Sequence, residues 1–257
     1  MSNDFSGKTA LVTGAASGIG LAVVRHLAAH GARRIIMSDL NADGLAAAAA
    51  TIGGAKIDTL AGDVSDEAFW EAAAPALEGL DIAHANAGAG GANVPLADCD
   101  LAAWRRVMAV NLDGAFLTIR SAMRAMKAKG TGGACLITAS AAGVKPELGS
   151  AAYSVAKAGV IHLAKCAAKE GAPDRIRVNA YAPGCVETPI WEQLDAFKEL
   201  EAKIGRDATF AEFAKTMVPL GRFAKPEEVA AQMCFLLSDA SSYTTGMLLL
   251  SDGGYTL

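Results

Sequence analysis

The chain has 257 residues, of which 52% are hydrophobic and 19% are charged, and this suits one large globular domain with an ample core. Its formal net charge of −4 at pH 7 argues against a surface that binds nucleic acid or an anionic membrane. No apolar run approaches the length of a spanning helix and no signal peptide is recognisable, so we expect a cytoplasmic protein without a membrane partner.

Short apolar runs alternate along the chain with longer segments of helical periodicity. The runs predict strands over Thr9–Val12, Arg34–Ser38, Ile57–Ala61, Ile82–Ala85, Ala134–Thr138, Arg177–Ala182 and Leu248–Ser251. The other segments predict helices over Gly20–Ala29, Asn41–Thr51, Asp66–Leu77, Leu101–Lys127, Ala152–Gly171, Pro189–Ile204, Phe210–Met217 and Pro226–Leu237. This alternation predicts a doubly wound α/β fold, with about seven parallel strands and helices on both faces. No boundary interrupts it, so residues 1–257 are predicted to form a single domain.

The first predicted strand runs directly into a glycine-rich segment, Thr13-Gly-Ala-Ala-Ser-Gly-Ile-Gly20, and then into a helix. Glycines permit a tight turn and a close backbone approach to a pyrophosphate, and the helix N-terminus offers free N–H groups. The spacing differs from the commoner G-x-G-x-x-G, and no Gly-Lys-Ser/Thr follows as in nucleotide hydrolases. The segment predicts a dinucleotide site, with a purely structural turn as the alternative.

Asp39 closes the second predicted strand, about 20 residues beyond the glycine-rich segment. A carboxylate at this distance can accept hydrogen bonds from the adenosine ribose hydroxyls and would repel a 2′-phosphate. Asp39 therefore favours NAD over NADP. The alternative is that Asp39 caps the helix that follows.

Tyr153 and Lys157 lie four residues apart in a predicted helix and therefore share one face. A phenol has a reference pKa of about 10, and a neighbouring cation lowers that pKa by favouring the phenolate. The pair can then act as a general acid–base near neutral pH. A tyrosine packed beneath a lysine stem is the alternative.

The cysteines and histidines do not have the spacing that is typical of metal ligands. The cysteines are odd in number and without C-x-x-C spacing, which predicts reduced packing residues: Cys99, Cys135, Cys166, Cys185 and Cys234. The histidines form no cluster and suit ordinary core or surface positions: His26, His30, His84 and His162. We expect no metal site.

Taken together, these motifs resemble those of the short-chain dehydrogenase/reductase family from Gly7 to Leu257, nearly the whole chain. The resemblance implies a Rossmann-like fold with NAD as cofactor. It also implies cofactor contacts at Gly14, Ser17, Gly18, Ile19, Gly20, Asp39, Asp63, Val64, Asn86, Ala87, Gly88, Tyr153, Lys157, Pro183, Gly184, Val186 and Thr188.

The resemblance further implies hydride transfer between the nicotinamide and a secondary alcohol or ketone. Tyr153 would exchange the proton, and Ser140 would hydrogen-bond the substrate oxygen. Lys157 would lower the Tyr153 pKa and hold the nicotinamide ribose, and Asn111 would anchor a relay water. Singly these residues have structural alternatives: Ser140 as a surface serine, Asn111 as a cap or kink, and Thr188 as a cap before Pro189.

The substrate is less defined than the chemistry. In the family, the segment after Gly184 forms a lid, here about residues 189–217. Apolar residues recur there at helical spacing, which suits packing or an apolar substrate: Ile190, Leu194, Phe197 and Ile204. With a small, mostly apolar loop at 141–148, this predicts an uncharged, fairly hydrophobic substrate, cyclic or aromatic.

Two other functions stay open: a 3-oxoacyl-type carbonyl reductase, and a non-catalytic dinucleotide-binding redox sensor. The resemblance also implies a homo-oligomer, tetramer or dimer, formed through the two long helices. One departure from the family is a short stretch between Asp63 and Asp81, where Pro75 should end its helix early.

Overall fold

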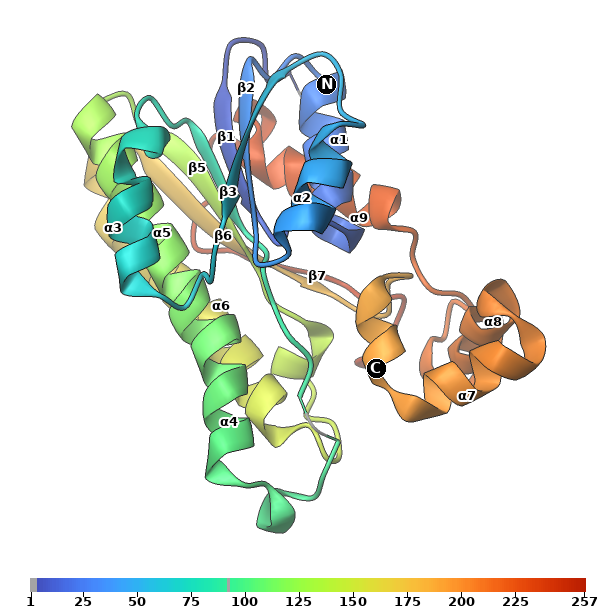
Figure 1. The fold of residues 1–257 in the computed structure, drawn as a ribbon. Helices are drawn as coiled ribbons and strands as arrows, with labels where there is room; N and C mark the ends of the chain where they lie inside the picture. Colours follow the sequence, from blue (N-terminus) through green and yellow to red (C-terminus); the bar gives the residue numbers. More distant parts are fainter. Residues whose placement is uncertain (1–3, 92) are drawn as a thin grey trace.

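The computed structural model describes residues 4–91 and 93–257 and contains one parallel sheet covered by helices on both faces (Figure 1). The strand order is β3-β2-β1-β4-β5-β6-β7. The strands are β1 (Thr9–Thr13), β2 (Arg34–Asp39), β3 (Lys56–Ala61), β4 (Ile82–Ala85), β5 (Gly133–Thr138), β6 (Ile176–Pro183) and β7 (Leu248–Ser251). The predicted doubly wound, seven-stranded parallel sheet is confirmed.

The strand order reverses at β1, which pairs with β2 on one side and with β4 on the other. Connections leave in opposite directions at this point, so a crevice opens at the carboxyl ends of the strands. The glycine-rich segment follows β1 directly. The fold therefore places this segment at the crevice where ligands bind in open α/β sheets.

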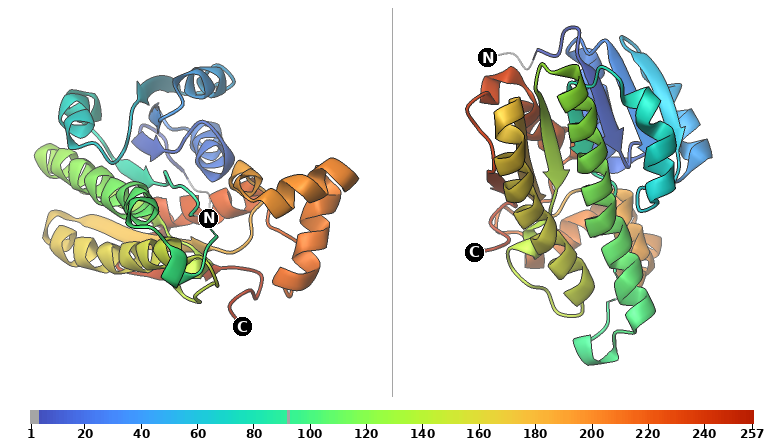
Figure 2. Two further views of the ribbon diagram at one scale, coloured as in Figure 1. Left: turned by 60° about the horizontal axis from the view of Figure 1, so that its bottom comes forward. Right: turned by 90° about the vertical axis from the view of Figure 1, so that its left-hand side faces the viewer.

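Helices of opposite faces bury two separate parts of the core (Figure 2). One face is covered by α1 (Gly18–Ala29), α2 (Ala42–Ala49) and α9 (Pro226–Leu237). The other is covered by α3 (Glu67–Ala73), α5 (Gly114–Lys129) and α6 (Ala151–Gly171). With both faces covered, the central strands are buried throughout, which explains their continuous apolar runs.

The predicted helix over Leu101–Lys127 is not continuous. It divides into α4 (Leu101–Met108), a π-helical turn (Ala109–Asp113) and α5. The Asn111 side chain donates to the Val107 carbonyl at 3.0 Å and so engages the preceding turn of backbone. Asn111 thus lies in a π-helical turn, and such turns are frequent at functional sites.

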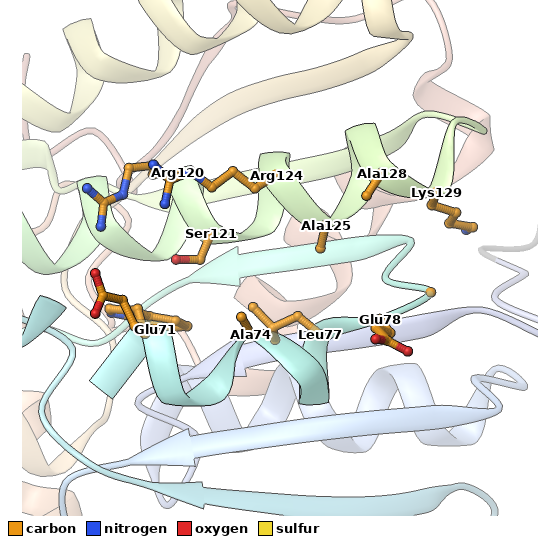
Figure 3. A pocket seen from close by; sticks show the side chains of 12 residues that line it. Glu71, Ala74, Leu77, Glu78, Arg120, Ser121, Arg124, Ala125, Ala128 and Lys129 are labelled. Atoms are coloured by element: carbon orange, nitrogen blue, oxygen red, sulfur yellow. The ribbon is translucent and has the colours of Figure 1, made fainter. Parts of the chain in front are cut away.

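The helix between Asp63 and Asp81 ends early, before Pro75, as predicted. Helix α3 ends at Ala73, and a 3₁₀ turn over Ala74–Leu77 contains Pro75. A groove of about 680 Å³ lies between this turn and α5, with Glu71 and Arg120 among the side chains that line it (Figure 3). It contains none of the predicted site residues.

Residues 189–217 form a separate helical unit that stands away from the sheet (Figure 1). It contains a 3₁₀ turn (Pro189–Gln193), α7 (Asp195–Ile204) and α8 (Arg206–Met217), so the predicted helix over Pro189–Ile204 is interrupted at Leu194. Phe197 and Phe210 are buried in its interior. Of the predicted apolar stripe, Phe197 is buried and Leu194 packs on the same core, whereas Ile190 and Ile204 are exposed.

Within residues 4–91 and 93–257, no helix is both long and apolar enough to cross a membrane. Over the same residues, no group of three or more His, Cys, Asp or Glu side chains is arranged to hold a metal ion.

Candidate active site

The glycine-rich turn is tightly packed against the start of α1. Gly14 and Gly18 have φ values of +63° and +52°, which favour glycine. A Cβ on Gly20 would lie 2.1 Å from the Gly14 carbonyl oxygen, so only glycine fits without moving backbone. Ser17 precedes α1 and its side chain makes no capping hydrogen bond with the described residues. This cradle, closed by backbone and an uncapped helix N-terminus, fits the pyrophosphate of a dinucleotide.

Asn86 and Thr13 brace the turn from the neighbouring strand. Asn86 Nδ2 donates to the Thr13 and Gly14 carbonyls at 3.1 and 3.4 Å, and Thr13 Oγ1 accepts from the Asn86 and Ala87 amides at 3.0 Å each. The Asn86-Ala87-Gly88 segment thus lies directly beside the glycine turn, as its predicted role in the cofactor bed requires.

Asp39 is held at the end of β2 beside the same turn. Its Oδ2 accepts from the Ala16 amide and its Oδ1 from the Asn41 amide, both at 3.0 Å. Helix α2 is capped instead by Asn41, whose side chain accepts from Gly44 N. The alternative reading of Asp39 as the helix cap is therefore wrong.

Two other predicted cofactor segments lie around this crevice. Thr188 lies against the glycine turn, because a Cβ added to Gly18 would be 3.3 Å from Thr188 Cγ2. Within the described residues, the Thr188 side chain makes no capping hydrogen bond. Gly184 packs on the C-terminal turn, where a Cβ would lie 2.6 Å from Asp252 Cα. Val186 joins the neighbouring segment through a bridge to Ala224.

Asp63 and Val64 follow β3. Over residues 4–91 and 93–257, neither forms a hydrogen bond to another predicted site residue. Asp63 Oδ1 accepts from the amide and hydroxyl of Ser65. Val64 is buried against Gly114, where an added Cβ would lie 2.7 Å from Val64 Cγ2.

Ser140, Tyr153 and Lys157 come together at the end of β5. The Ser140 side chain hydrogen-bonds the Tyr153 phenol. Lys157 Nζ lies 5.5 Å from the centre of the Tyr153 ring and donates to the Thr138 carbonyl at 2.9 Å. A phenol, a hydroxyl and a buried ammonium thus share one edge of the sheet.

Asn111 reaches this group through Gly88. Its amide donates to the Ala89 carbonyl at 2.9 Å and accepts from the Ala89 amide at 3.3 Å. A Cβ on Gly88 would lie 2.9 Å from Asn111 Oδ1 and 3.5 Å from Lys157 Nζ. Gly88 therefore lies close to both side chains, and an added Cβ would clash with the Asn111 amide oxygen.

The electrostatics of the pair differ from the sequence prediction. Burial raises the pKa of Tyr153 above its ordinary value, and the hydrogen bond from Ser140 opposes this rise. Burial also lowers the pKa of Lys157 to about 8. The pKa of Tyr153 is thus shifted in the opposite direction to the sequence prediction, and Lys157 is not among the groups that shift it.

Sequence reasoning missed Thr138 and His84. Thr138 is two residues before Ser140, and its carbonyl holds Lys157 while its hydroxyl contacts Asn86. His84 is fully buried beside Thr138, with Nε2 2.8 Å from Thr138 Oγ1. A histidine inside the otherwise apolar run Ile82–Ala85 was the available signal.

Comparisons with known proteins agree with the family resemblance that the sequence motifs indicated. Residues 14–256 match the family described as "Enoyl-(Acyl carrier protein) reductase". The chain is 41% identical to cis-4-hydroxycyclohexanecarboxylate dehydrogenase of Sinomonas cyclohexanicum, over 100% of this chain and 99% of that one. It is 40% identical to galactitol 2-dehydrogenase (L-tagatose-forming) of Cereibacter sphaeroides, over 98% and 96%.

A solved structure is also similar over nearly its whole length. L-sorbose reductase from Gluconobacter frateurii, complexed with NADPH and L-sorbose, superposes with a TM-score of 0.91. The two chains are 32% identical, and the match covers 99% of this chain and 98% of that one. With this fold, these motifs and these relatives, the chain belongs to the short-chain dehydrogenase/reductase family.

Proposed function

We propose that the protein is an NAD-dependent oxidoreductase that interconverts a secondary alcohol and its ketone. The observation that carries the proposal is the meeting of Ser140, Tyr153 and Lys157 at the end of β5, beside a cradle suited to a dinucleotide. A module that only bound the dinucleotide would have no need for a proton-exchanging group at this position.

The nicotinamide, when bound, supplies the redox chemistry by taking up or giving a hydride. The protein supplies the proton transfer: Tyr153 takes the proton of the alcohol in oxidation and returns it in reduction. Ser140 hydrogen-bonds the same oxygen and stabilises its developing charge. Lys157 places a positive charge beside the phenol and binds the nicotinamide ribose, and Asn111 anchors a water that connects Lys157 to solvent.

The cofactor-binding residues would be those predicted from the sequence, with Asp39 deciding between NAD and NADP. Its carboxylate is fixed by two backbone amides, so it cannot swing away from a 2′-phosphate without losing both hydrogen bonds. The solved relative was crystallised with NADPH, so the preference differs within the family and requires a direct test.

Asp39→Asn is expected to lower kcat/KM with NAD by about tenfold, because a neutral amide is a weaker acceptor for ribose hydroxyls. It should at the same time improve kcat/KM with NADP, since the repulsion is removed. Initial rates with each cofactor check this. Asp43→Asn, at an exposed position in the first turn of α2, is the matched control and should change neither rate. An unchanged NAD to NADP ratio in Asp39→Asn would contradict the role of Asp39.

For the substrate we propose an uncharged cyclic secondary alcohol. Two relatives that act on ring alcohols support the ring: cis-4-hydroxycyclohexanecarboxylate dehydrogenase, and cyclohexanol dehydrogenase of Acinetobacter sp. (strain SE19), which is 37% identical. Only the second supports an uncharged substrate, because the substrate named for the first carries a carboxylate. The apolar stripe of residues 189–217 supports it less than the sequence suggested, because Phe197 and Phe210 face the interior of that unit. We propose that this unit is the substrate lid.

A second candidate is a substrate that carries further hydroxyl groups. Tyr255 hydrogen-bonds Glu147, and Lys145 Nζ donates to the Tyr255 carbonyl at 2.9 Å. Tyr255 also packs on the core of residues 189–217, so these polar groups join the loop after Ser140 to the proposed lid. A carboxylate there can accept a hydrogen bond from a second hydroxyl and would repel an anionic group.

The test is a substrate panel run with NAD and with NADP, followed at the NADH absorbance band. It compares cyclohexanol, cis-cyclohexane-1,2-diol, galactitol and cis-4-hydroxycyclohexanecarboxylate. We expect the highest kcat/KM with NAD and an uncharged ring alcohol. Galactitol as the best substrate would favour the second candidate, and a best rate with the carboxylate would overturn the uncharged class. No oxidation of any secondary alcohol would contradict the proposed function.

We further propose a homo-oligomer, dimer or tetramer, assembled through α5 and α6. Apolar side chains on this face support it: Phe116 is 43% exposed and Val155 is 47% exposed. Side chains of this kind are commonly covered at interfaces between subunits.

A further inference from the structure

We propose that His84 is a positioning residue, which orients Thr138 so that the glycine turn and Lys157 keep their places relative to one another. The inference rests on the function proposed above and adds to it a group that neither the motifs nor the relatives' names assign. It is carried by a continuous chain of hydrogen bonds at the centre of the sheet.

The chain of bonds fixes which ring nitrogen of His84 carries the proton. Thr138 Oγ1 donates its single hydrogen to Asn86 Oδ1 at 3.1 Å. It can therefore only accept from His84 Nε2, which lies 2.8 Å away. The Asn86 amide is itself fixed, because its Nδ2 must donate to the Thr13 and Gly14 carbonyls. His84 is thus the Nε2–H tautomer.

Thr138 is the branch point of the chain of bonds. Through its hydroxyl it joins Asn86 and hence the Gly14 carbonyl of the glycine turn. Through its backbone carbonyl it accepts from Lys157 Nζ at 2.9 Å. A shift of Thr138 would therefore disturb the proposed cofactor cradle and the proposed catalytic lysine together.

His84 acts by orientation and not by proton transfer. Its ring is fully buried, and burial lowers its pKa to about 3, so it stays neutral under ordinary conditions. Its Nδ1 has no hydrogen-bond partner among the described residues, so the chain of bonds ends there and offers no path for a proton. Val12 and Leu136, which pair with His84 in the flanking strands, are both apolar and buried.

An unpartnered buried acceptor is unfavourable, and an aliphatic residue at this place would avoid it. The three other residues of β4 are Ile82, Ala83 and Ala85, which are all apolar and buried. Stability alone thus does not explain a histidine here, whereas a need for one N–H directed at Thr138 does.

The test compares His84→Leu, which keeps bulk without a donor, with His84→Gln, whose amide can place an N–H near the Nε2 position. Measured quantities are the Kd for NADH by fluorescence titration, kcat, the KM for the alcohol, and Tm. We expect His84→Leu to weaken NADH binding by about three- to tenfold, the loss of roughly one hydrogen bond. His84→Gln should restore the wild-type Kd to within about twofold, and the alcohol KM should change little in either variant.

The matched control is Tyr181→Phe, which removes a part-buried side-chain hydrogen bond to Gln232. Tyr181 pairs with Thr138 between β5 and β6, and the substitution leaves in place the hydrogen bonds that the Thr138 hydroxyl makes to His84 and Asn86. It should lower Tm without changing the Kd for NADH. A lower Tm in His84→Leu with an unchanged Kd would overturn the proposal, since His84 would then serve stability only.

Thr138→Val gives an independent arm if His84→Leu does not fold. It should weaken NADH binding to a similar extent, because it removes the hydroxyl through which His84 would act. An unchanged Kd in Thr138→Val would overturn the proposal. In the wild type, ¹⁵N shifts should identify the Nε2–H tautomer, unchanged between about pH 5 and pH 8. If the wild type bound no NADH, the proposed function would fail instead.

Discussion

Tyr153→Phe is expected to lower turnover of the alcohol by a factor of about 10² or more, while NADH still binds. The substitution removes the phenol oxygen that exchanges the proton, and it leaves the ring that packs beneath Lys157 Nζ. Of the two proposed hydrogen-bond partners of the substrate oxygen, Tyr153 and Ser140, only Ser140 would then remain. Steady-state rates and NADH titration measure the two effects separately.

The control for this substitution is Tyr243→Phe, at a fully exposed tyrosine outside the site. It should leave kcat, the Kd for NADH and Tm at wild-type values. If Tyr153→Phe kept near-native turnover, another group would have to exchange the proton, and the assigned role would be wrong. A parallel loss of NADH binding would instead indicate a disrupted site.

Gly20→Ala is expected to weaken NADH binding by about tenfold or more, because overpacking at a tight contact forces backbone to move. The added Cβ would lie 2.1 Å from the Gly14 carbonyl oxygen and 2.8 Å from Asn86 Nδ2. Both belong to the cradle, so relief of the clash must either widen the turn or displace Asn86. Titration with NADH and thermal unfolding report the change.

Gly53→Ala serves as the comparison, because an added Cβ there meets nothing within 4 Å and its φ is not positive. It should leave both NADH binding and Tm unchanged. If Gly20→Ala bound NADH as tightly as Gly53→Ala does, the close approach at the turn would have no part in forming the cofactor site.

The sequence predicted the sheet well because its central strands are largely buried and its strands are separated by periodic helices. It predicted the ends of elements less well where a side chain competes with the backbone. The π-helical turn at Asn111 depends on bonds to Val107 and Ala89, and a pattern of hydrophobic residues cannot register such bonds.

The resemblance, and not spacing alone, indicated the candidate site: Ser140, Tyr153 and Lys157 come together at the end of β5 as the resemblance implied. The direction of the Tyr153 pKa could not be predicted in the same way, because it depends on how deeply the phenol is buried. Likewise, the apolar stripe near residue 197 could line a substrate or pack inward, and only the tertiary structure decides in favour of packing for Phe197.

The central claim is that this site moves a hydride from a carbinol carbon to NAD while Tyr153 takes the proton. Oxidation of cyclohexanol deuterated at the carbinol carbon, followed by mass spectrometry of the reduced nicotinamide, tests it most directly. We predict that the wild type forms NADH carrying the deuterium, and that Tyr153→Phe forms it at least about 10² times more slowly. Reduced nicotinamide without deuterium, or equal rates in the two proteins, would contradict the claim.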